Sequence, residues 1–322
     1  MSATTPLSVL ALSGGVGGAK LTLGLSDVMD SERLNVLVNT ADDFRHFGLQ
    51  VCPDIDTVVY TLAGLSNSEQ GWGLADETFH ALKGLERLGG DTWFQLGDFD
   101  LATHLWRSER LAGGHDLLQV THDLAVRLGV HSRIHPMSAD PVSTLVCCEQ
   151  GELPFQHYFV REQCAPSVTG FRFEGIDQAR PNEQVLALLR EQPLAAIIVC
   201  PSNPFVSIDP ILQLPGLWTT LKESPTPVVL VCPIVAGQAL KGPAAKMMTE
   251  LGVPVTALGV AEYYCGRYPG LLNHFVIDTS DAKLAADIEQ MGLRVTVTPT
   301  VMKTRQDKAQ LASTVLAVAA EG

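Results

Sequence analysis

A glycine-rich loop near the start of the chain has the composition of a phosphate-binding turn. The segment Ser13-Gly-Gly-Val-Gly-Gly-Ala-Lys20 follows the short apolar run Leu7–Leu12. Glycines let backbone N–H groups approach an anion closely, and the start of the following helix adds its positive end. The predicted phosphate-binding residues are Gly14, Gly15, Val16, Gly17 and Lys20. The alternative is a tight turn between strand and helix that needs glycine for packing alone.

This loop matches neither of two familiar nucleotide-binding motifs. A dinucleotide fingerprint requires glycine where Lys20 stands, and an acidic ribose ligand after the second strand, where the sequence has Asn39. A Walker loop requires Ser or Thr after the lysine, but Leu21 follows it here. The sequence therefore predicts a phosphate loop of another type.

Four carboxylates stand between positions 42 and 56, at the ends of predicted elements: Asp42, Asp43, Asp54 and Asp56. Hard oxygen ligands suit Mg²⁺, which usually also binds phosphate oxygens of the substrate. We predict that Asp43 and Asp56 hold Mg²⁺, and that one of them orients or deprotonates a substrate hydroxyl. Asp42 and Asp54 could equally cap helices and face solvent, and Asp54 is a good N-cap candidate.

Two later loops also have residues suited to binding nucleotides. In Pro201-Ser-Asn-Pro204, the prolines make Asn203 a rigid amide that could contact a base or a phosphate. The segment Lys241–Lys246 opens a predicted helix with two cations and is a second plausible anion site.

Apolar periodicity predicts an α/β fold. We expect a Rossmann-like, doubly wound, mostly parallel sheet, with a core over 1–70 and 130–322 and a helical insertion over 71–129. Ligands of such sheets bind outside the carboxyl ends of the strands, where the loops above lie. The main predicted helices are Ala19–Met29, one starting at Asp54, Ala75–Leu88, Leu101–Arg110, Leu117–Leu128, Gly242–Leu251 and Gln306–Ala319. The main predicted strands are Leu34–Asn39, His131–Ile134, Ser143–Cys147, Phe155–Val160, Ala195–Cys200, Val228–Cys232, Val255–Leu258, His274–Ile277 and Arg294–Thr298.

Composition excludes several classes of protein. A formal charge of -13 argues against binding to nucleic acid, and the sequence has no polybasic segment for a membrane surface. The apolar runs are too short for a signal peptide or a membrane span. Seven cysteines without C-x-x-C spacing indicate reduced thiols in a cytoplasmic protein.

Taken together, the loops resemble those of the 2-phospho-L-lactate transferases. Each motif alone is weak, but nine in this order between residues 13 and 264 are specific, and they cover nearly the whole chain. The motifs are Ser13–Lys20, Asn39–Asp43, Pro53–Val58, Gly97–Asp100, Ala102–His104, Pro136–Thr144, Pro201–Pro204, Gly242–Lys246 and Val260–Tyr264.

The resemblance implies a phosphotransferase for substituted phosphate groups in the biosynthesis of coenzyme F420. Such an enzyme moves a phospholactyl-type group from a guanosine diphosphate-linked donor to Fo, a deazaflavin alcohol, and releases GMP. The group could be phospholactate, phosphoenolpyruvate or phosphoglycerate. The resemblance also implies a Rossmann-like core, Mg²⁺ and a homodimer. It places Ser202 and Asn203 at the guanosine part of the donor, and Thr40, Asp56 and Gln95 at Fo.

The sequence departs from the family pattern at the predicted acceptor end. We expect a basic residue where Gln95 stands and an arginine where Phe99 stands. The segment Arg45–Phe47 also differs from a loop that usually contains tryptophan. These departures weaken the expected anion contacts and leave the acceptor contacts and the donor open.

Two other functions compete with this interpretation. Gluconeogenesis-factor proteins share the fold and bind a nucleotide sugar without catalysis, but the acidic residues and the Pro201–Pro204 loop fit the transferase better. An NAD(P)-dependent oxidoreductase conflicts with the failed fingerprint and the absent ribose-binding acid.

Overall fold

The structure is a computed structural model that describes residues 7–67, 71–191 and 193–321. Within these residues, seven strands form one sheet in the order β14-β13-β10-β9-β1-β2-β5, and every neighbouring pair is parallel. The predicted doubly wound α/β class is confirmed. The strands are β1 (Ser8–Ser13), β2 (Leu34–Val38), β5 (Arg133–Pro136), β9 (Leu194–Val199), β10 (Val228–Val231), β13 (His274–Ile277) and β14 (Arg294–Val297).

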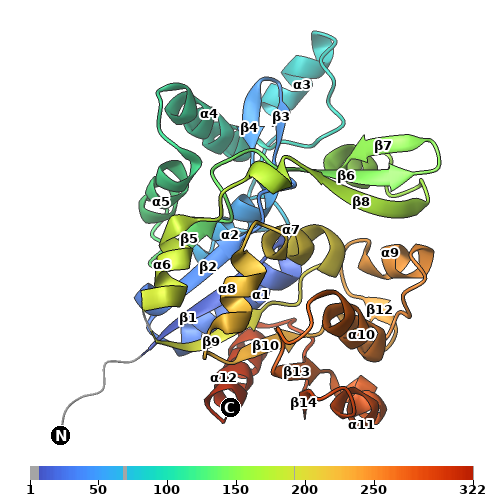
Figure 1. Cartoon of the computed structure of the whole chain (residues 1–322). Coiled ribbons are helices and arrows are strands. Elements are labelled where there is room, and N and C mark those ends of the chain that lie inside the picture. Colours follow the sequence, from blue (N-terminus) through green and yellow to red (C-terminus); the bar gives the residue numbers. More distant parts are fainter. Residues whose placement is uncertain (1–6, 68–70, 192, 322) are drawn as a thin grey trace, which may run out of the picture.

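Helices cover both faces of this sheet because both faces are apolar (Figure 1). Successive side chains of a strand point to opposite faces. In β1, Leu10 and Leu12 join one hydrophobic cluster, whereas Val9 and Ala11 join the other. The first cluster includes α6 (Glu183–Glu191), α7 (Asp209–Leu212), α8 (Leu217–Glu223), α9 (Ala244–Glu250) and α10 (Ala257–Arg267). The second includes α1 (Gly15–Val28), α2 (Pro53–Leu62), α5 (Leu117–Arg127) and α12 (Arg305–Ala320).

The order of the strands reverses between β1 and β9. From β1 the chain continues to β2 and β5 on one side, and later to β9, β10, β13 and β14 on the other. Ligands of open parallel sheets bind at such a reversal, outside the carboxyl ends of the strands. The loops after β1 and β9 therefore mark the place to look for a site.

Smaller elements extend beyond this end of the sheet, away from the two termini (Figure 1). They include the hairpin of β3 (Phe44–His46) and β4 (Leu49–Val51), and an antiparallel sheet in the order β7-β6-β8. Its strands are β6 (Ser143–Cys148), β7 (Gly151–Pro154) and β8 (Val168–Glu174). The helices α3 (His80–Arg87), α4 (Asp98–Ala112) and α5 follow α2 along the chain, before β5. Their treatment as a separate insertion over 71–129 remains a prediction.

Several local predictions were wrong. Phe155–Val160 is not a strand, because β7 ends at Pro154 and His157–Arg161 forms a π-helical turn. The expected strand Val255–Leu258 is the start of α10, where the Thr256 side chain accepts a hydrogen bond from the Gly259 N–H. The helix predicted from Ala19 begins at Gly15, inside the glycine loop, and the helix predicted from Ala75 begins at His80. The β3–β4 hairpin was not predicted.

The helices α1 and α12 are in backbone contact. A Cβ atom added to Gly24 would lie 2.1 Å from the carbonyl oxygen of Lys308. Only glycine permits so close an approach, so Gly24 joins the first helix to the last one of the described chain.

Other expectations from composition can be compared with the structure directly. The seven cysteines are free thiols, and Cys52, Cys148, Cys200 and Cys232 are buried. Among the described residues, helices long and apolar enough to cross a membrane are absent.

Candidate functional site

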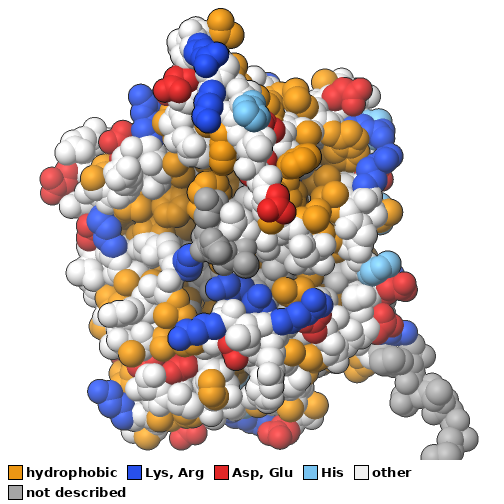
Figure 2. All heavy atoms as spheres, turned by 180° about the vertical axis from the view of Figure 1, so that it is seen from behind, with side chains coloured by type: hydrophobic (Ala, Val, Ile, Leu, Met, Phe, Trp, Pro, Cys, Tyr) orange, Lys and Arg blue, Asp and Glu red, His pale blue; other side chains and the backbone are white. Residues whose placement is uncertain are grey.

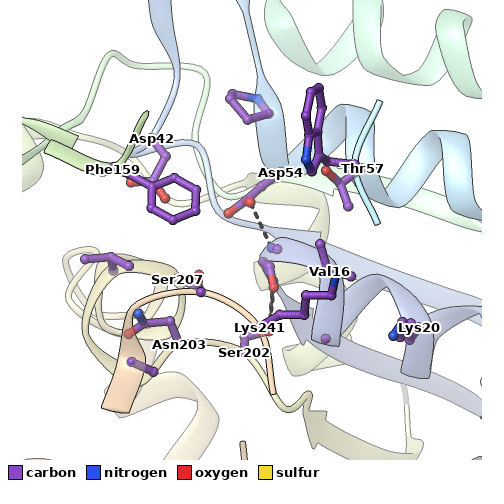
Figure 3. Close-up of a pocket in the computed structure, with 18 of the residues that line it drawn as sticks. Val16, Lys20, Asp42, Asp54, Thr57, Phe159, Ser202, Asn203, Ser207 and Lys241 are labelled. Atoms are coloured by element: carbon purple, nitrogen blue, oxygen red, sulfur yellow. Dashed lines mark hydrogen bonds between the residues drawn. The ribbon is translucent and has the colours of Figure 1, made fainter. Parts of the chain in front are cut away.

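A cavity of about 730 Å³ opens beside the loops that follow β1 and β9. Its wall includes the starts of α1 and α2, parts of the loops after β2 and β9, and two later segments, 239–244 and 300–303. Figure 3 shows Ser202, Val16 and Asp54 facing this space from three of these elements. Because the cavity lies where the strand order reverses, it is the candidate site.

The start of α1 is packed so tightly that it requires glycine. A Cβ atom on Gly14 would lie 2.6 Å from the Ser207 Cβ atom, and one on Gly17 would lie 2.2 Å from the Pro201 carbonyl oxygen. Gly15 has a φ of +61°, in the left-handed region. Close packing explains why Gly14 and Gly17 are glycine, and the left-handed backbone explains why Gly15 is. Their predicted binding of phosphate stays a prediction, although Gly14, Gly15, Val16 and Gly17 all line the cavity.

Ser202 fastens the loop after β9 to the start of α1. Its buried hydroxyl donates to the Gly14 carbonyl oxygen at 2.8 Å and accepts from the Gly14 N–H at 3.1 Å. The side chain lines the cavity, but its proton is already used in this pair of bonds. Ser202 therefore shapes the site by joining the two loops at the strand reversal.

Asn203 lines the same part of the cavity. Its Oδ1 atom accepts from the Phe205 N–H at 3.0 Å, which fixes the turn that follows. Its Nδ2 atom donates to the Met247 Sδ atom at 3.4 Å. A thioether is a weak acceptor, so this amide can exchange it for a better one on a ligand.

Asp54 caps α1 and not its own helix. Its Oδ1 atom accepts from the Gly15 N–H at 2.8 Å, and its Oδ2 atom accepts from the Asn39 Nδ2 atom at 3.0 Å. The residue preceding α2 is Cys52, so the predicted N-cap role and solvent exposure of Asp54 were wrong. Burial raises the pKa of Asp54 to about 6, against the opposing effect of the two hydrogen bonds.

Asp42 is a buried carboxylate on the cavity wall, which contradicts the alternative that it faces solvent. Its Oδ1 atom has no hydrogen-bond partner among the described residues. Burial, followed by the charge of Asp54, raises the pKa of Asp42 well above its usual value. A carboxylate oxygen in this condition is available to a cation or to a proton on a ligand.

Asp43 and Thr40 lie near the cavity but do not line it. Within the described chain, the Asp43 Oδ1 atom and the Thr40 Oγ1 atom are buried without hydrogen-bond partners. Burial raises the pKa of Asp43 well above its usual value. The structure thus brings both predicted residues behind the wall that Asp42 forms, and their roles stay predictions.

Asp56 lines the cavity with its carboxylate held by Arg107 of α4. The Arg107 Nη1 atom donates to Asp56 Oδ2 at 3.1 Å, and Nη2 donates to Asp56 Oδ1. Arg107 is fully buried. Burial is the largest influence and acts to lower the pKa of Arg107, but the attraction and hydrogen bonding of Asp56, together with Cys52 and Tyr60, outweigh it and raise that pKa. Arg107 therefore keeps its charge in the interior, and the two-pronged geometry of the pair fixes the Asp56 side chain.

His104 connects this pair to Asp100. The His104 Nδ1 atom lies 3.1 Å from Arg107 Nη1, and because a guanidinium can only donate, Nδ1 is the acceptor. With Nδ1 as the acceptor, the ring presents its Nε2–H toward Asp100, whose Oδ1 atom lies 3.3 Å away. The Tyr60 hydroxyl donates to the same Asp100 oxygen at 2.8 Å.

Asp56, Asp100 and His104 form a group that could hold a metal ion, since one ligand atom of each lies within 4.8 Å of the others. Their present bonds fit Mg²⁺ poorly. Both oxygens of Asp56 already accept from a buried cation, and Mg²⁺ prefers oxygen ligands to imidazole nitrogen. The partnerless oxygens of Asp42 and Asp43 fit a hard cation better.

Aromatic side chains line another part of the cavity. Trp72, Phe94, Phe155 and Phe159 all contribute to its wall, and Gln95, which follows Phe94 in the sequence, lines the same cavity. Phe155 and Phe159 are stacked, with an interplanar angle of 9°. Gln95 is exposed and donates to the Thr92 carbonyl oxygen at 3.4 Å. Flat apolar surfaces of this kind suit a planar ring.

Lysines line the opposite part. Lys20, Lys241 and Lys303 reach the wall from three distant segments, and Figure 3 shows Lys20 and Lys241 near Val16. In the space-filling view, Lys and Arg side chains gather near the middle of one face, next to apolar hollows (Figure 2). Lys246, expected at a second anion site, instead bonds both Glu250 oxygens at 2.6 and 2.8 Å. That part of the prediction was wrong.

Sequence reasoning missed several residues of this site. Arg107 lies in the predicted helix Leu101–Arg110, and only tertiary structure shows that it is buried against Asp56. Lys303 and Trp72 stand in loops without a motif. The one residue that could have pointed to Arg107 in the sequence was His104. It belongs to the motif Ala102–His104 and lies one helical turn before Arg107.

The parallel sheet has a cavity at its strand reversal, and this arrangement defines a Rossmann-like α/β protein. The cavity wall combines a glycine-rich helix start, buried carboxylates and lysines. The profile of the family described as "2-phospho-L-lactate transferase CofD" matches residues 9–316. The chain belongs to this family. It is a transferase of this type, which moves a phospholactyl or enolpyruvyl group to Fo in coenzyme F420 biosynthesis, and the predicted family and enzyme class are confirmed.

Relatives with two different names match almost the full chain. A "Phosphoenolpyruvate transferase" of Kitasatospora aureofaciens is 40% identical over 319 residues, covering 97% of this chain and 98% of the relative. A "2-phospho-L-lactate transferase" of Methanosarcina acetivorans is 36% identical over 308 residues, covering 96% and 98%. A crystal structure of a UPF0052 family member from Bacillus halodurans has a TM-score of 0.62 at 16% identity, covering 97% of this chain and 99% of that chain, and supports the fold alone.

Proposed function

We propose that the cavity binds both substrates at once, with Fo against the aromatic wall and a guanosine diphosphate-linked donor along the start of α1. One observation carries this proposal: a single cavity of about 730 Å³ combines flat aromatic surface, buried carboxylates and lysines. Across the view of Figure 3, Asp54 falls between Phe159 and Lys20. A planar acceptor and an anionic donor would then meet beside the carboxylates.

The reaction is the attack of the primary ribityl hydroxyl of Fo on a phosphorus of the donor. A new P–O bond forms, the P–O bond to GMP breaks, and the hydroxyl proton passes to a base. Such a transfer depends mainly on alignment of the reacting atoms and on neutralisation of phosphate charge. Lysines and the amides at the start of α1 supply positive charge, while the packed loops fix positions.

The carboxylates divide into two kinds, and this division suggests their roles. Asp56 is held by Arg107, which supports its proposed contact with Fo over its proposed role as a metal ligand. The free Oδ1 atoms of Asp42 and Asp43 support a Mg²⁺ site around the proposed ligand Asp43. Mg²⁺ bound there would neutralise phosphate charge. The proposed contacts of Thr40 and Gln95 with Fo, and of Ser202 and Asn203 with guanosine, rest on the family resemblance.

The transferred group is proposed to be phosphoenolpyruvyl. Relatives named phosphoenolpyruvate transferase are 39–40% identical to the chain, against 34–36% for those named 2-phospho-L-lactate transferase. The site residues themselves do not separate these donors.

A mass-resolved assay tests the proposed donor and acceptor. Purified protein would receive Fo, Mg²⁺ and each of the three guanylylated phospho-acids in separate reactions. We expect GMP release and a product with the mass of Fo plus the phosphoenolpyruvyl group. A different product mass would show that one of the other two phospho-acids is the transferred group. The absence of product with all three donors would refute the proposed reaction. Omission of Mg²⁺ should abolish turnover.

A homodimer in the cytoplasm is the proposed state of the enzyme, in line with the family resemblance. Light scattering coupled to size-exclusion chromatography would test the dimer, because the monomer mass is 34.6 kDa.

A further inference from the structure

Lysines from both ends of the sequence meet at one wall of the cavity. Lys20 of α1, Lys241 before α9 and Lys303 before α12 line the cavity. Lys308, in the first turns of α12, acts electrostatically on Lys20. We call these four residues the lysine wall. The family motifs quoted from the sequence include only one of them, Lys20.

Like charges do not gather in this way without an opposite charge to stabilise them. The chain has 22 Lys and Arg against 35 Asp and Glu, so acidic partners are plentiful. Nevertheless, the ammonium groups of Lys20 and Lys303 form no ion pair with any described residue. Lys246 shows the usual arrangement, since it is paired with Glu250. Lys20 and Lys303 therefore retain their positive charge for a ligand.

The segment that carries Lys303 is fixed at both ends. Before it, the Thr300 N–H donates to Asp278 Oδ2 at 2.8 Å. After it, the N–H groups of Lys303 and Thr304 donate to Asp307 Oδ2 at 2.9 and 2.7 Å, in the capping box of α12. The backbone that presents Lys303 to the cavity is thus ordered before any ligand arrives, which lowers the entropic cost of binding.

Lys308 and Lys20 are held near each other by the packing of two helices. The close approach at Gly24 places the Lys308 backbone directly against α1. Burial, and then the charges of Lys308 and Lys241, lower the pKa of Lys20. An anionic ligand bound among these residues would relieve that mutual repulsion.

We propose that Lys303, together with Lys20 and Lys241, binds the phosphate groups of the donor, and that Lys308 strengthens this site electrostatically. The identity of the donor as a guanosine diphosphate derivative rests on the proposed function. The lysine wall itself requires only a ligand with adjacent phosphates. Lys303 and Lys241 would contact the phosphates, and Lys308 would act through Lys20.

Calorimetric titrations of the full chain with GDP and with inorganic diphosphate test the proposal. Lys303→Gln should weaken both affinities about tenfold, as expected for one charge-assisted contact. Lys308→Gln should weaken them about threefold, because its effect is electrostatic and indirect. Lys303→Arg should retain most of the affinity. Lys283→Gln is the matched control, since Lys283 is exposed and lies outside the cavity wall.

The outcomes separate the lysine wall from the proposed donor. Equal affinities in Lys303→Gln, Lys283→Gln and the unmodified protein would overturn the lysine wall, as would the absence of diphosphate and GDP binding in the unmodified protein. Diphosphate binding that depends on Lys303, without GDP binding, would support the lysine wall and refute the guanylylated donor. Guanosine, which has no phosphate, should bind equally to all variants that bind GDP.

Discussion

Arg107 donates hydrogen bonds to both carboxylate oxygens of Asp56, and the guanidinium is buried while the carboxylate lines the cavity. A residue on α4 therefore fixes a residue on α2 that faces the cavity. The expected cations at Gln95 and Phe99 are missing from the sequence, yet this end of the cavity does contain one buried positive charge. That charge is neutralised by Asp56, so it orients a carboxylate and attracts no anion.

Asp56→Asn is expected to abolish transfer and to destabilise the protein. The substitution leaves the Arg107 charge buried without its counterion, a loss of about 3–5 kcal/mol. A domain of ordinary stability, about 5–15 kcal/mol, would still fold. Urea unfolding and the Fo assay measure the two effects on the same preparation.

The double variant Asp56→Asn with Arg107→Met controls for the buried charge. It removes both partners, so it should recover part of the lost stability without recovering turnover. Wild-type turnover in Asp56→Asn would disprove the proposed role of Asp56. Equal stability of Asp56→Asn and the unmodified protein would show that the ion pair is weak.

Lys20→Ala is expected to weaken donor binding more than Fo binding, because Lys20 lies on the lysine wall, opposite the aromatic one. The lowered pKa of Lys20 adds a dependence on pH. A lysine is charged below its pKa, so donor affinity should fall at a lower pH than an ordinary lysine would allow. Titrations with GDP between neutral and alkaline pH should show this decline in the unmodified protein and a weaker one in Lys20→Ala. Unchanged donor affinity in the variant would contradict the phosphate-binding prediction.

Asp54 should make stability fall as pH rises through the weakly acidic range. Its pKa is about 6 in the folded protein, against an ordinary value of 3.8, so between these values the folded state binds more protons than the unfolded state. The contribution of Asp54 to the free energy of unfolding is fully present below about pH 4. It declines as the pH rises toward 6, by about 3 kcal/mol at most.

Urea unfolding of Asp54→Asn across this range provides the comparison. The variant loses the titration, and it also loses one of the two bonds to Gly15 and Asn39. It should therefore be less stable but show a flatter dependence on pH. Parallel curves for the two proteins would show that Asp54 does not titrate in this range.

Gly17→Ala is expected to destabilise the protein by about 2 kcal/mol and to lower activity. The new Cβ atom would lie 2.2 Å from the Pro201 carbonyl oxygen, so the start of α1 must separate from the loop after β9. Gly84→Ala in α3 is the matched control, because nothing lies within 4 Å of its Cβ position. This control should gain about 0.5–1 kcal/mol from helix propensity. Thermal unfolding that ranks the two variants in the opposite order would contradict the packing explanation.

The sequence allowed the sheet to be predicted because its strands are short apolar runs with turn residues between them. β13 was predicted with its correct bounds, and the ends of β9, β10 and α12 were close. Periodicity failed at Phe155–Val160 and Val255–Leu258, because a short apolar run can form a strand or a buried helical turn equally well.

The site was predicted in outline but not in its contacts. The loop motifs correctly predicted which segments meet at one cavity, because parallel strands end at the same edge of the sheet. They could not show that Asp54 caps α1, or that Arg107 holds Asp56, because both contacts join residues far apart in the chain. Local pattern contains no information about such pairs, and this is also why Lys303 and Lys308 went unnoticed.

The contact of Gly24 with Lys308 has a consequence for how the protein is made. The glycine loop is translated early, but the helix that completes its surroundings is translated after every strand of the sheet. A chain still growing on the ribosome can form β1 and α1, yet it has only part of its anion site. Competence to bind the donor would then begin only when α12 has left the ribosome and docked.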